Sequence, residues 1–189
     1  MSIPLTLDRN VIRGNALTGV ALVVAGSAVI ALAAQIAIPL PFTPVPLTLS
    51  PLAVLMIGIV LGSRRGAAAA VLYLLEGLSG LPVGAQGHGG PLWLIGPTAG
   101  YLYAYPFAAF IAGWFSERSW GQDIFRAFCA MLIALSVIYL GGWSWLAILV
   151  GPRAAFTIAI VPFVIADLVK IAIGAAILPW AQRLITRVS

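Results

Sequence analysis

Long apolar segments alternate with short polar or Pro/Gly-rich stretches along almost the whole chain. A helix needs about 20 mostly apolar residues to cross a bilayer, and the pattern predicts six such segments as one domain. We expect them at residues 16–38, 49–61, 67–81, 97–115, 124–140 and 154–178, the fifth having room to continue to Val150. The predicted fold is an all-α integral membrane protein in which residues 1–189 form a single membrane domain.

Composition excludes an ordinary soluble domain. Of the 189 residues, 62% are hydrophobic and 8% are charged, against about 25% charged residues in soluble proteins. Residues 1–15 contain no apolar core followed by a small-residue cleavage site, so the first apolar segment is expected to be retained as a span. Cys129 is the single cysteine, which excludes an internal disulfide and a thiolate metal site.

The basic residues predict the orientation. They stand in ones and twos at the ends of apolar segments, which is typical of topology signals and not of a nucleic-acid surface. With six spans, Arg153 alone falls on the side away from the termini, and Lys170 lies within a span. The others fall on the side of the termini: Arg9, Arg13, Arg64, Arg65, Arg118, Arg126, Arg183 and Arg187. The positive-inside rule therefore predicts that both termini are cytoplasmic.

Two loops on the opposite side are unusually rich in Pro or Gly. The first, PLPFTPVP at residues 39–46, has four prolines in eight residues, which excludes helix and favours an extended, turning chain. The second is GAQGHGGPLWLIGPTAGY at residues 84–101. Non-helical backbone near a membrane is tolerated where protein covers it or where it lines a cavity. Together the loops predict the roof of an external ligand site.

Three ionisable residues lie inside the predicted spans: Glu76, Asp167 and Lys170. A charge at a helix centre costs about 2.5 to 3.5 kcal/mol on insertion scales, so such residues usually face a cavity or a partner. Asp167 and Lys170 are three residues apart and share one helix face. We expect an ion pair with a functional role, since an apolar pair would usually be at least as stable. Pro162 is expected to bend this helix upstream of the pair.

Small residues recur on one stripe of the first predicted helix, at Thr18, Ala21, Ala25 and Ala28. Such stripes allow a second helix to approach closely in a bilayer. In a chain this rich in alanine the spacing also arises by chance or from internal packing. A partner contact at Ala21 and Ala25 is the alternative.

Enzymatic readings find little support. Gly77-Leu78-Ser79-Gly80 matches the GxSG pattern of rhomboid-type proteases, but His88 follows nine residues after Ser79 in a Gly-rich loop, without the rigid element that a catalytic base needs. His88 has no neighbouring metal ligands in sequence, and no phosphate-binding loop precedes a Lys and Ser/Thr. The sequence predicts no enzyme, no metal site and no nucleotide hydrolysis by this chain.

Four motifs in order, covering Gln35 to Lys170, resemble those of the BioY family, the biotin-specific substrate-binding (S) components of energy-coupling-factor (ECF) transporters. They are QIAIPLPFTPVPLTLSPLAVLMIGIVLGSRRG, YLLEGLSGLPVGAQGHGG, LIGPTAGYL and PFVIADLVK. The resemblance implies six transmembrane helices in a bacterial cytoplasmic membrane and an external site that binds biotin as transported ligand, with no cofactor. It also implies partners: a transmembrane coupling protein, contacted through Ala21 and Ala25, and ATPase subunits.

The same resemblance implies roles for particular residues. The family's DxxK pattern falls on Asp167, as acceptor for the urea N–H groups of biotin, and on Lys170, as donor to a ligand oxygen. The Gly-rich loop would close over the ligand and aromatic residues would supply walls or hydroxyls: Gln86, Gly87, Gly89, Gly90, Trp93, Tyr101 and Tyr103. The alternative is a stand-alone secondary transporter of biotin or a related small molecule, for which Glu76 and Asp167 would be proton-relay carboxylates.

Overall fold

Helices make up most of the computed structural model, which describes residues 16–120 and 123–188, with side chains up to residue 178. The helices are α2 (Ala16–Gln35), α3 (Ser50–Leu61), α4 (Ser63–Leu78), α5 (Ala99–Ser116), α6 (Ile124–Val150), α7 (Pro152–Ala159) and α8 (Val161–Val188). The Gly-rich loop contains two 3-10 turns, η1 (Ala85–Gly87) and η2 (Pro91–Leu94). The Pro-rich loop is closed at its base by two antiparallel strands, β1 (Ala37–Ile38) and β2 (Leu47–Thr48), with Ala37 opposite Thr48.

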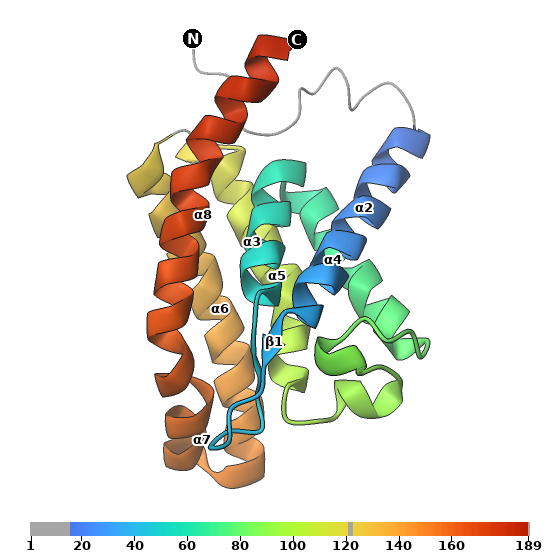
Figure 1. Cartoon of the computed structure of the whole chain (residues 1–189), viewed down its shortest axis with the longest axis vertical. Helices are drawn as coiled ribbons and strands as arrows, with labels where there is room; N and C mark the ends of the chain where they lie inside the picture. The colour runs from blue at the N-terminus through green and yellow to red at the C-terminus, as the bar shows by residue number, and fades with distance from the viewer. Residues whose placement is uncertain (1–15, 121–122, 189) are drawn as a thin grey trace.

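The long helices run in alternating directions, as Figure 1 shows: α2, α4 and α6 descend in this view, and α3, α5 and α8 ascend. The β1–β2 hairpin, the Gly-rich loop and α7 therefore lie at one end of the bundle, which we call the loop end. The α3–α4 turn, the end of α5 and the start of α6 lie at the other. Arg64, Arg65, Arg118 and Arg126 belong to that other end. Arg9 and Arg13 lie outside the described residues, as do the side chains of Arg183 and Arg187.

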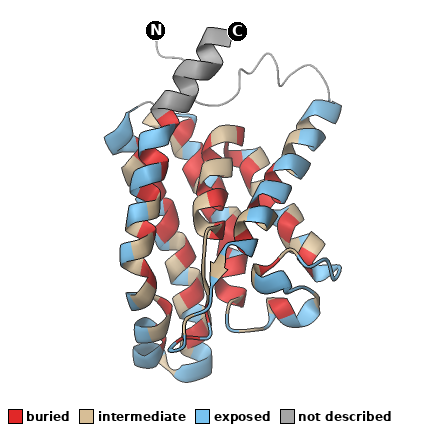
Figure 2. Cartoon of the chain, viewed as in Figure 1, coloured by how far each residue is buried: buried red, intermediate tan, exposed pale blue. Residues whose placement is uncertain are grey.

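The outer surface of the bundle is apolar. Leu32, Phe107, Ile148 and Ile165 are 66% to 80% exposed, and buried positions lie on the inner faces of the helices (Figure 2). In the described chain, three helical segments are long and apolar enough to cross a membrane: Ala16–Gln35, Ile124–Val150 and Pro152–Leu178. An apolar surface of this extent is stable against lipid and not against water, so the chain is a multi-pass membrane protein.

Several helix ends follow from local sequence. Pro51 stands in the first turn of α3, where its missing N–H costs nothing. Gly62 has φ of 82° between α3 and α4, a conformation that other residues rarely adopt. The Asp123 side chain caps α6 by accepting from the backbone N–H of Arg126 at 3.1 Å.

The last apolar segment, expected as one helix over 154–178, is two helices. α7 ends at Ala159 and α8 begins at Val161, with Pro162 in its first turn. Proline has no N–H to continue the helical ladder and its ring crowds the preceding turn, so the expected bend is a complete break. The expected end of this segment at residue 178, just before Pro179, was wrong, because α8 continues to Val188. A single missing backbone hydrogen bond is tolerated in helices of membrane proteins.

Helix α5 is the centre of the bundle and packs against α3, α4 and α6. Its approach to α3 depends on Gly58, where a Cβ atom would stand 2.3 Å from the carbonyl oxygen of Ala109. On α5 itself, a Cβ at Gly113 would stand 2.4 Å from the backbone nitrogen of Ser63. Neither position has room for a side chain, and helices in contact through small residues pack closely in bilayers. This rigid core supports the loop end.

Candidate ligand-binding site

A pocket of about 600 Å³, counting the space at its opening to solvent, lies between the hairpin, the Gly-rich loop and the helices. Aromatic and aliphatic side chains form most of its wall, with a few hydroxyls and a single carboxylate among the described residues. The lining residues are Val45, Pro46, Leu47, Thr48, Ser50, Pro51, Tyr73, Ala85, Trp93, Thr98, Tyr101, Leu102, Tyr105, Ile138, Tyr139, Phe163 and Asp167. A mostly apolar pocket with a few placed polar groups is the usual form of a small-molecule site.

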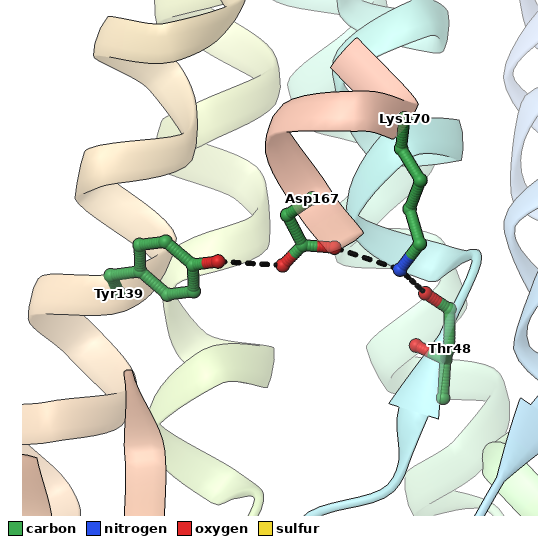
Figure 3. A network of polar contacts seen from close by, with 4 residues as sticks. All are labelled: Thr48, Tyr139, Asp167 and Lys170. Atoms are coloured by element: carbon green, nitrogen blue, oxygen red, sulfur yellow. Dashed lines mark hydrogen bonds and ion pairs between the residues drawn. The ribbon is translucent and has the colours of Figure 1, made fainter. Parts of the chain in front are cut away.

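Asp167 on α8 is the buried polar centre of this pocket, with 4% of its surface exposed. One carboxylate oxygen accepts from the hydroxyl of Tyr139 on α6 at 2.8 Å, and the other accepts from the Lys170 ammonium at 2.7 Å. Figure 3 shows these two partners on opposite sides of the carboxylate. Each carboxylate oxygen can accept more than one hydrogen bond, so both retain capacity for a ligand donor.

Lys170 connects the carboxylate to the hairpin. Its ammonium also donates to the backbone carbonyl of Thr48, in strand β2, at 2.7 Å. The predicted ion pair with Asp167 is therefore present and extends to the Pro-rich loop (Figure 3). Lys170 stands beside Asp167 (Figure 3) and is not among the residues that line the pocket.

The break between α7 and α8 supplies two further attachments. Pro162 has no N–H to give to the carbonyl of Ile158, four residues earlier, and this carbonyl accepts from the Thr43 hydroxyl at 2.8 Å. The next carbonyl, that of Ala159, accepts from the Tyr101 hydroxyl at 2.6 Å. The helix break thus fixes the tip of the hairpin and one aromatic wall of the pocket.

Trp93 forms the opposite wall and is held by glycines. A Cβ atom at Gly77 would stand 2.0 Å from the Trp93 ring, and one at Gly84 would stand 2.7 Å from its indole nitrogen. The ring also meets Tyr73 edge to face, with 5.5 Å between centroids, an arrangement that aromatic pairs favour. Only glycine at these positions lets α4 and the loop close on the indole.

The Gly-rich loop is internally bonded. The N–H groups of Gly84 and Gly90 donate to the carbonyls of His88 and Gly77 at 2.9 and 2.7 Å. The amide nitrogen of Gln35, the last residue of α2, lies 3.1 to 3.5 Å from the carbonyls of Pro82, Val83 and Gly84. The loop is held in place by hydrogen bonds, and those from Gln35 tie its conformation to α2.

Of the loop residues expected at the site, Trp93 lines the pocket. Gln86, Gly87 and Gly89 are exposed and Gly90 is half-buried, and none of them lines it. Gln86 has φ of 58°, the left-handed conformation that directs the chain back on itself. Ala85 is the residue of this turn that reaches the pocket.

Tyrosines on α5 divide by helical face. Tyr101 lines the pocket as expected, and so does Tyr105, four residues further on. Tyr103 is 42% exposed and its hydroxyl donates to the carbonyl of Leu94 outside the pocket. Residues two apart point about 200° apart around a helix, so Tyr103 shares a face with neither and we leave it out of the site.

Four aromatic residues of the pocket were missed from sequence: Tyr73, Tyr105, Tyr139 and Phe163. Tyr105 had a usable signal, since it follows Tyr101 by one helical turn. Tyr139 lies in an apolar segment, and its partner Asp167 is 28 residues away. Such a contact between helices leaves no local pattern.

The remaining polar candidates are occupied elsewhere. Glu76 accepts from the hydroxyl of Ser27, a fully buried residue of α2, and so joins α2 to α4. Ser79 donates to the carbonyl of Glu76 and a ring nitrogen of His88 lies 2.6 Å from the carbonyl of Ala85. In the described part of the chain, Ser79 and His88 do not bond each other as a catalytic pair would. Among the described residues no three potential metal ligands cluster.

The fold and the pocket define a class: a multi-pass helical membrane protein with one small-molecule site at the loop end of its bundle. The model of the BioY family matches residues 7–187, which is nearly the whole chain. The chain belongs to the BioY family.

Named relatives and a solved structure agree with this membership. A probable biotin transporter BioY from Pyrococcus horikoshii is 42% identical over 75% of this chain and 81% of its own length. The biotin transporter BioY from Thermotoga maritima is 39% identical over 80% of this chain and 88% of its own. A crystal structure of the S-component for biotin from an ECF-type ABC transporter matches with a TM-score of 0.79 and 25% identity, covering 88% of this chain and 92% of that one. These relatives are transporters and not enzymes.

Proposed function

We propose that this chain captures biotin at the outer face of a bacterial cytoplasmic membrane, as the substrate-binding component of an ECF uptake system. The observation that carries the proposal is the buried Asp167 carboxylate in an aromatic pocket, fixed by Tyr139 and Lys170. Family membership supplies the identity of the ligand, and the pocket supplies matching chemistry.

Biotin combines a polar cyclic urea with an apolar ring. A urea N–H donates to Asp167, whose oxygens each keep capacity for a further hydrogen bond. The Lys170 ammonium has three N–H donors, two of which bond the Asp167 carboxylate and the Thr48 carbonyl. Lys170 does not itself line the pocket, so the proposed pose brings the urea carbonyl beside Asp167, where it accepts from the third N–H. The apolar thiophane ring packs on the aromatic walls, where Trp93 and Phe163 are 8% and 4% exposed.

The proposed topology has six crossings, formed by α2, α3, α4, α5, α6 and α8, with both termini in the cytoplasm. The alternating helix directions support it (Figure 1). The basic residues support it as well, because Arg64, Arg65, Arg118 and Arg126 belong to one end and Arg153 to the loop end. The loop end with the pocket then faces outside.

Biotin retention tests the function directly. The full chain is purified in detergent from cells grown with biotin, denatured, and the released small molecules are measured by mass spectrometry. We expect close to one equivalent of biotin per chain. A preparation that releases none, and whose melting temperature does not rise when biotin is added, would refute biotin capture.

Tyr139→Phe is expected to weaken biotin binding by about tenfold without loss of folding. The substitution removes the hydroxyl that donates to the second Asp167 oxygen and keeps the ring, and hydrogen bonds to charged groups contribute about 1.5 to 3 kcal/mol. Isothermal titration measures the change. Tyr103→Phe is the matched control, since that hydroxyl bonds Leu94 outside the pocket, and equal effects in the two variants would contradict a specific role of Tyr139.

The partners of the ECF module are proposed to dock on α2. Thr18, Ala21, Ala25 and Ala28 are all exposed, while the face formed by Gly26 and Ser27 is buried against the bundle. The stripe is therefore free of internal packing, and small residues allow a partner helix to approach.

Ala21→Leu is expected to abolish uptake of biotin by cells that hold the ATPase module, while the purified variant binds biotin with wild-type affinity. A bulky side chain keeps the partner helix away without touching the pocket. Radiolabelled uptake and titration measure the two effects. Ala172→Leu places the same change on an exposed position of α8 and serves as control. Normal uptake by Ala21→Leu would favour the stand-alone secondary transporter.

A further inference from the structure

Among the residues that the structure describes, none that lines the pocket is a positive partner for a carboxylate. Asp167 is the single charged residue among those that line it. The neighbouring Lys170 ammonium is held between the Asp167 carboxylate and the Thr48 carbonyl (Figure 3). A ligand carboxylate at Lys170 would therefore stand beside a second carboxylate, and like charges at such short range repel strongly.

Other cations of the described chain lie elsewhere. Arg64, Arg65, Arg118 and Arg126 belong to the opposite end of the bundle. Arg153 is exposed at the start of α7, and His88 is exposed in the Gly-rich loop. None of these residues lines the pocket.

Five backbone N–H groups of the Gly-rich loop are also committed. Those of Gly84, Gly87, His88, Gly90 and Trp93 donate to carbonyls within residues 77–90. The remaining polar lining consists of neutral groups such as the hydroxyls of Ser50 and Thr98. A hydroxyl donates to an amide carbonyl as well as to a carboxylate, so it does not favour the acid.

An ionised carboxylate buried without a partner is very costly. We propose that the pocket binds the cyclic urea and the apolar ring of its ligand and leaves the carboxylate in water at the opening. The site thus accepts neutral biotin derivatives modified at the carboxyl group, such as biotinamide and biotin joined through an amide to lysine. The inference rests on the proposed function and extends its substrate class from the free acid to amides of the biotin carboxyl group.

The test compares biotin and biotinamide on the same preparation of the full chain, freed of ligand and measured by titration. We expect the two dissociation constants to agree within about fivefold. Binding of biotinamide that is 100-fold weaker or worse would overturn the inference while leaving biotin capture intact. A chain that binds neither compound would overturn both.

Two variants make the comparison more specific. Because the Lys170 ammonium is proposed to donate to the urea carbonyl, which both ligands have, Lys170→Met is expected to weaken the binding of biotin and of biotinamide equally. The ratio of the two dissociation constants then stays unchanged. A selective loss of biotin would identify Lys170 as the carboxylate partner and overturn the inference. Arg153→Met changes an exposed arginine of the loop end and is expected to leave the ratio unchanged as well. A selective loss of biotin binding in this variant would equally overturn the inference. If a variant does not fold, the wild-type comparison still decides.

Discussion

Asp167→Asn will lower the affinity for biotin at least tenfold and will also destabilise the protein. The side chain keeps its size but loses the charge that accepts from Tyr139 and Lys170 and that we propose accepts from the ligand. Breaking a buried ion pair by removing one partner costs about 3 to 5 kcal/mol, because the other charge remains without compensation. Titration with biotin and thermal unfolding in detergent measure the two effects separately.

The double variant Asp167→Asn with Lys170→Met separates binding from stability. It removes both charges and so should recover most of the melting temperature while binding stays at least tenfold weaker. Near-normal affinity in the single variant would remove Asp167 from the site. Recovery of binding in the double variant would mean that the single substitution acts through misfolding alone.

Gly77→Ala will reduce biotin binding by at least about tenfold, although it adds one methyl group. The new Cβ would stand 2.0 Å from the Trp93 ring, which must then move away from α4 and from its contact with Tyr73. Overpacking of this kind typically costs about 1 to 3 kcal/mol, and here the displaced ring is a wall of the pocket. Titration and tryptophan fluorescence measure affinity and ring environment.

Gly96→Ala is the matched control. Gly96 lies three residues after Trp93 in the Gly-rich loop, whereas Gly77 lies near the end of α4. A Cβ at Gly96 would meet the carbonyl oxygen of Leu92 at 3.4 Å, an ordinary contact. We expect affinity within about twofold of wild type. Equal losses in both variants would indicate a general sensitivity of the loop, and an unchanged Gly77→Ala would refute the role of Trp93 as a fixed wall.

Much of the fold could be predicted because lipid imposes a simple rule on sequence. Where backbone groups must bond within their own segment, helices fill the apolar stretches, and observed α3 (Ser50–Leu61) lies within a residue of the predicted 49–61. The α7–α8 break was harder to predict. Pro162 gave the signal for a bend. Complete separation of α7 from α8 also involves Thr43 and Tyr101, whose hydroxyls donate to the freed carbonyls from distant elements. Contacts of this kind leave no local pattern in the sequence.

The site was only partly predictable for a similar reason. Asp167 and Lys170 can be recognised from sequence because they are charged residues within an apolar helix, and their spacing predicts contact. The loop residues Gln86, Gly87 and Gly89 were expected near the ligand because glycine permits close approach. In the structure they are exposed, and the close approaches that glycine permits are made within the loop itself. Which side of a turn faces a cavity depends on neighbours that sequence alone does not place.

The hairpin contacts have a consequence for biogenesis. Thr43 bonds Ile158 across 115 residues of sequence, and Lys170 bonds Thr48 across 122. Synthesis proceeds from the N-terminus, so neither bond can form until α7, which contains Ile158, and α8, which contains Lys170, have been made. Biotin will therefore stabilise only chains whose final helix has been inserted, and, since a ligand that binds the native state raises its population, vitamin present during translation will increase the yield of completely assembled protein.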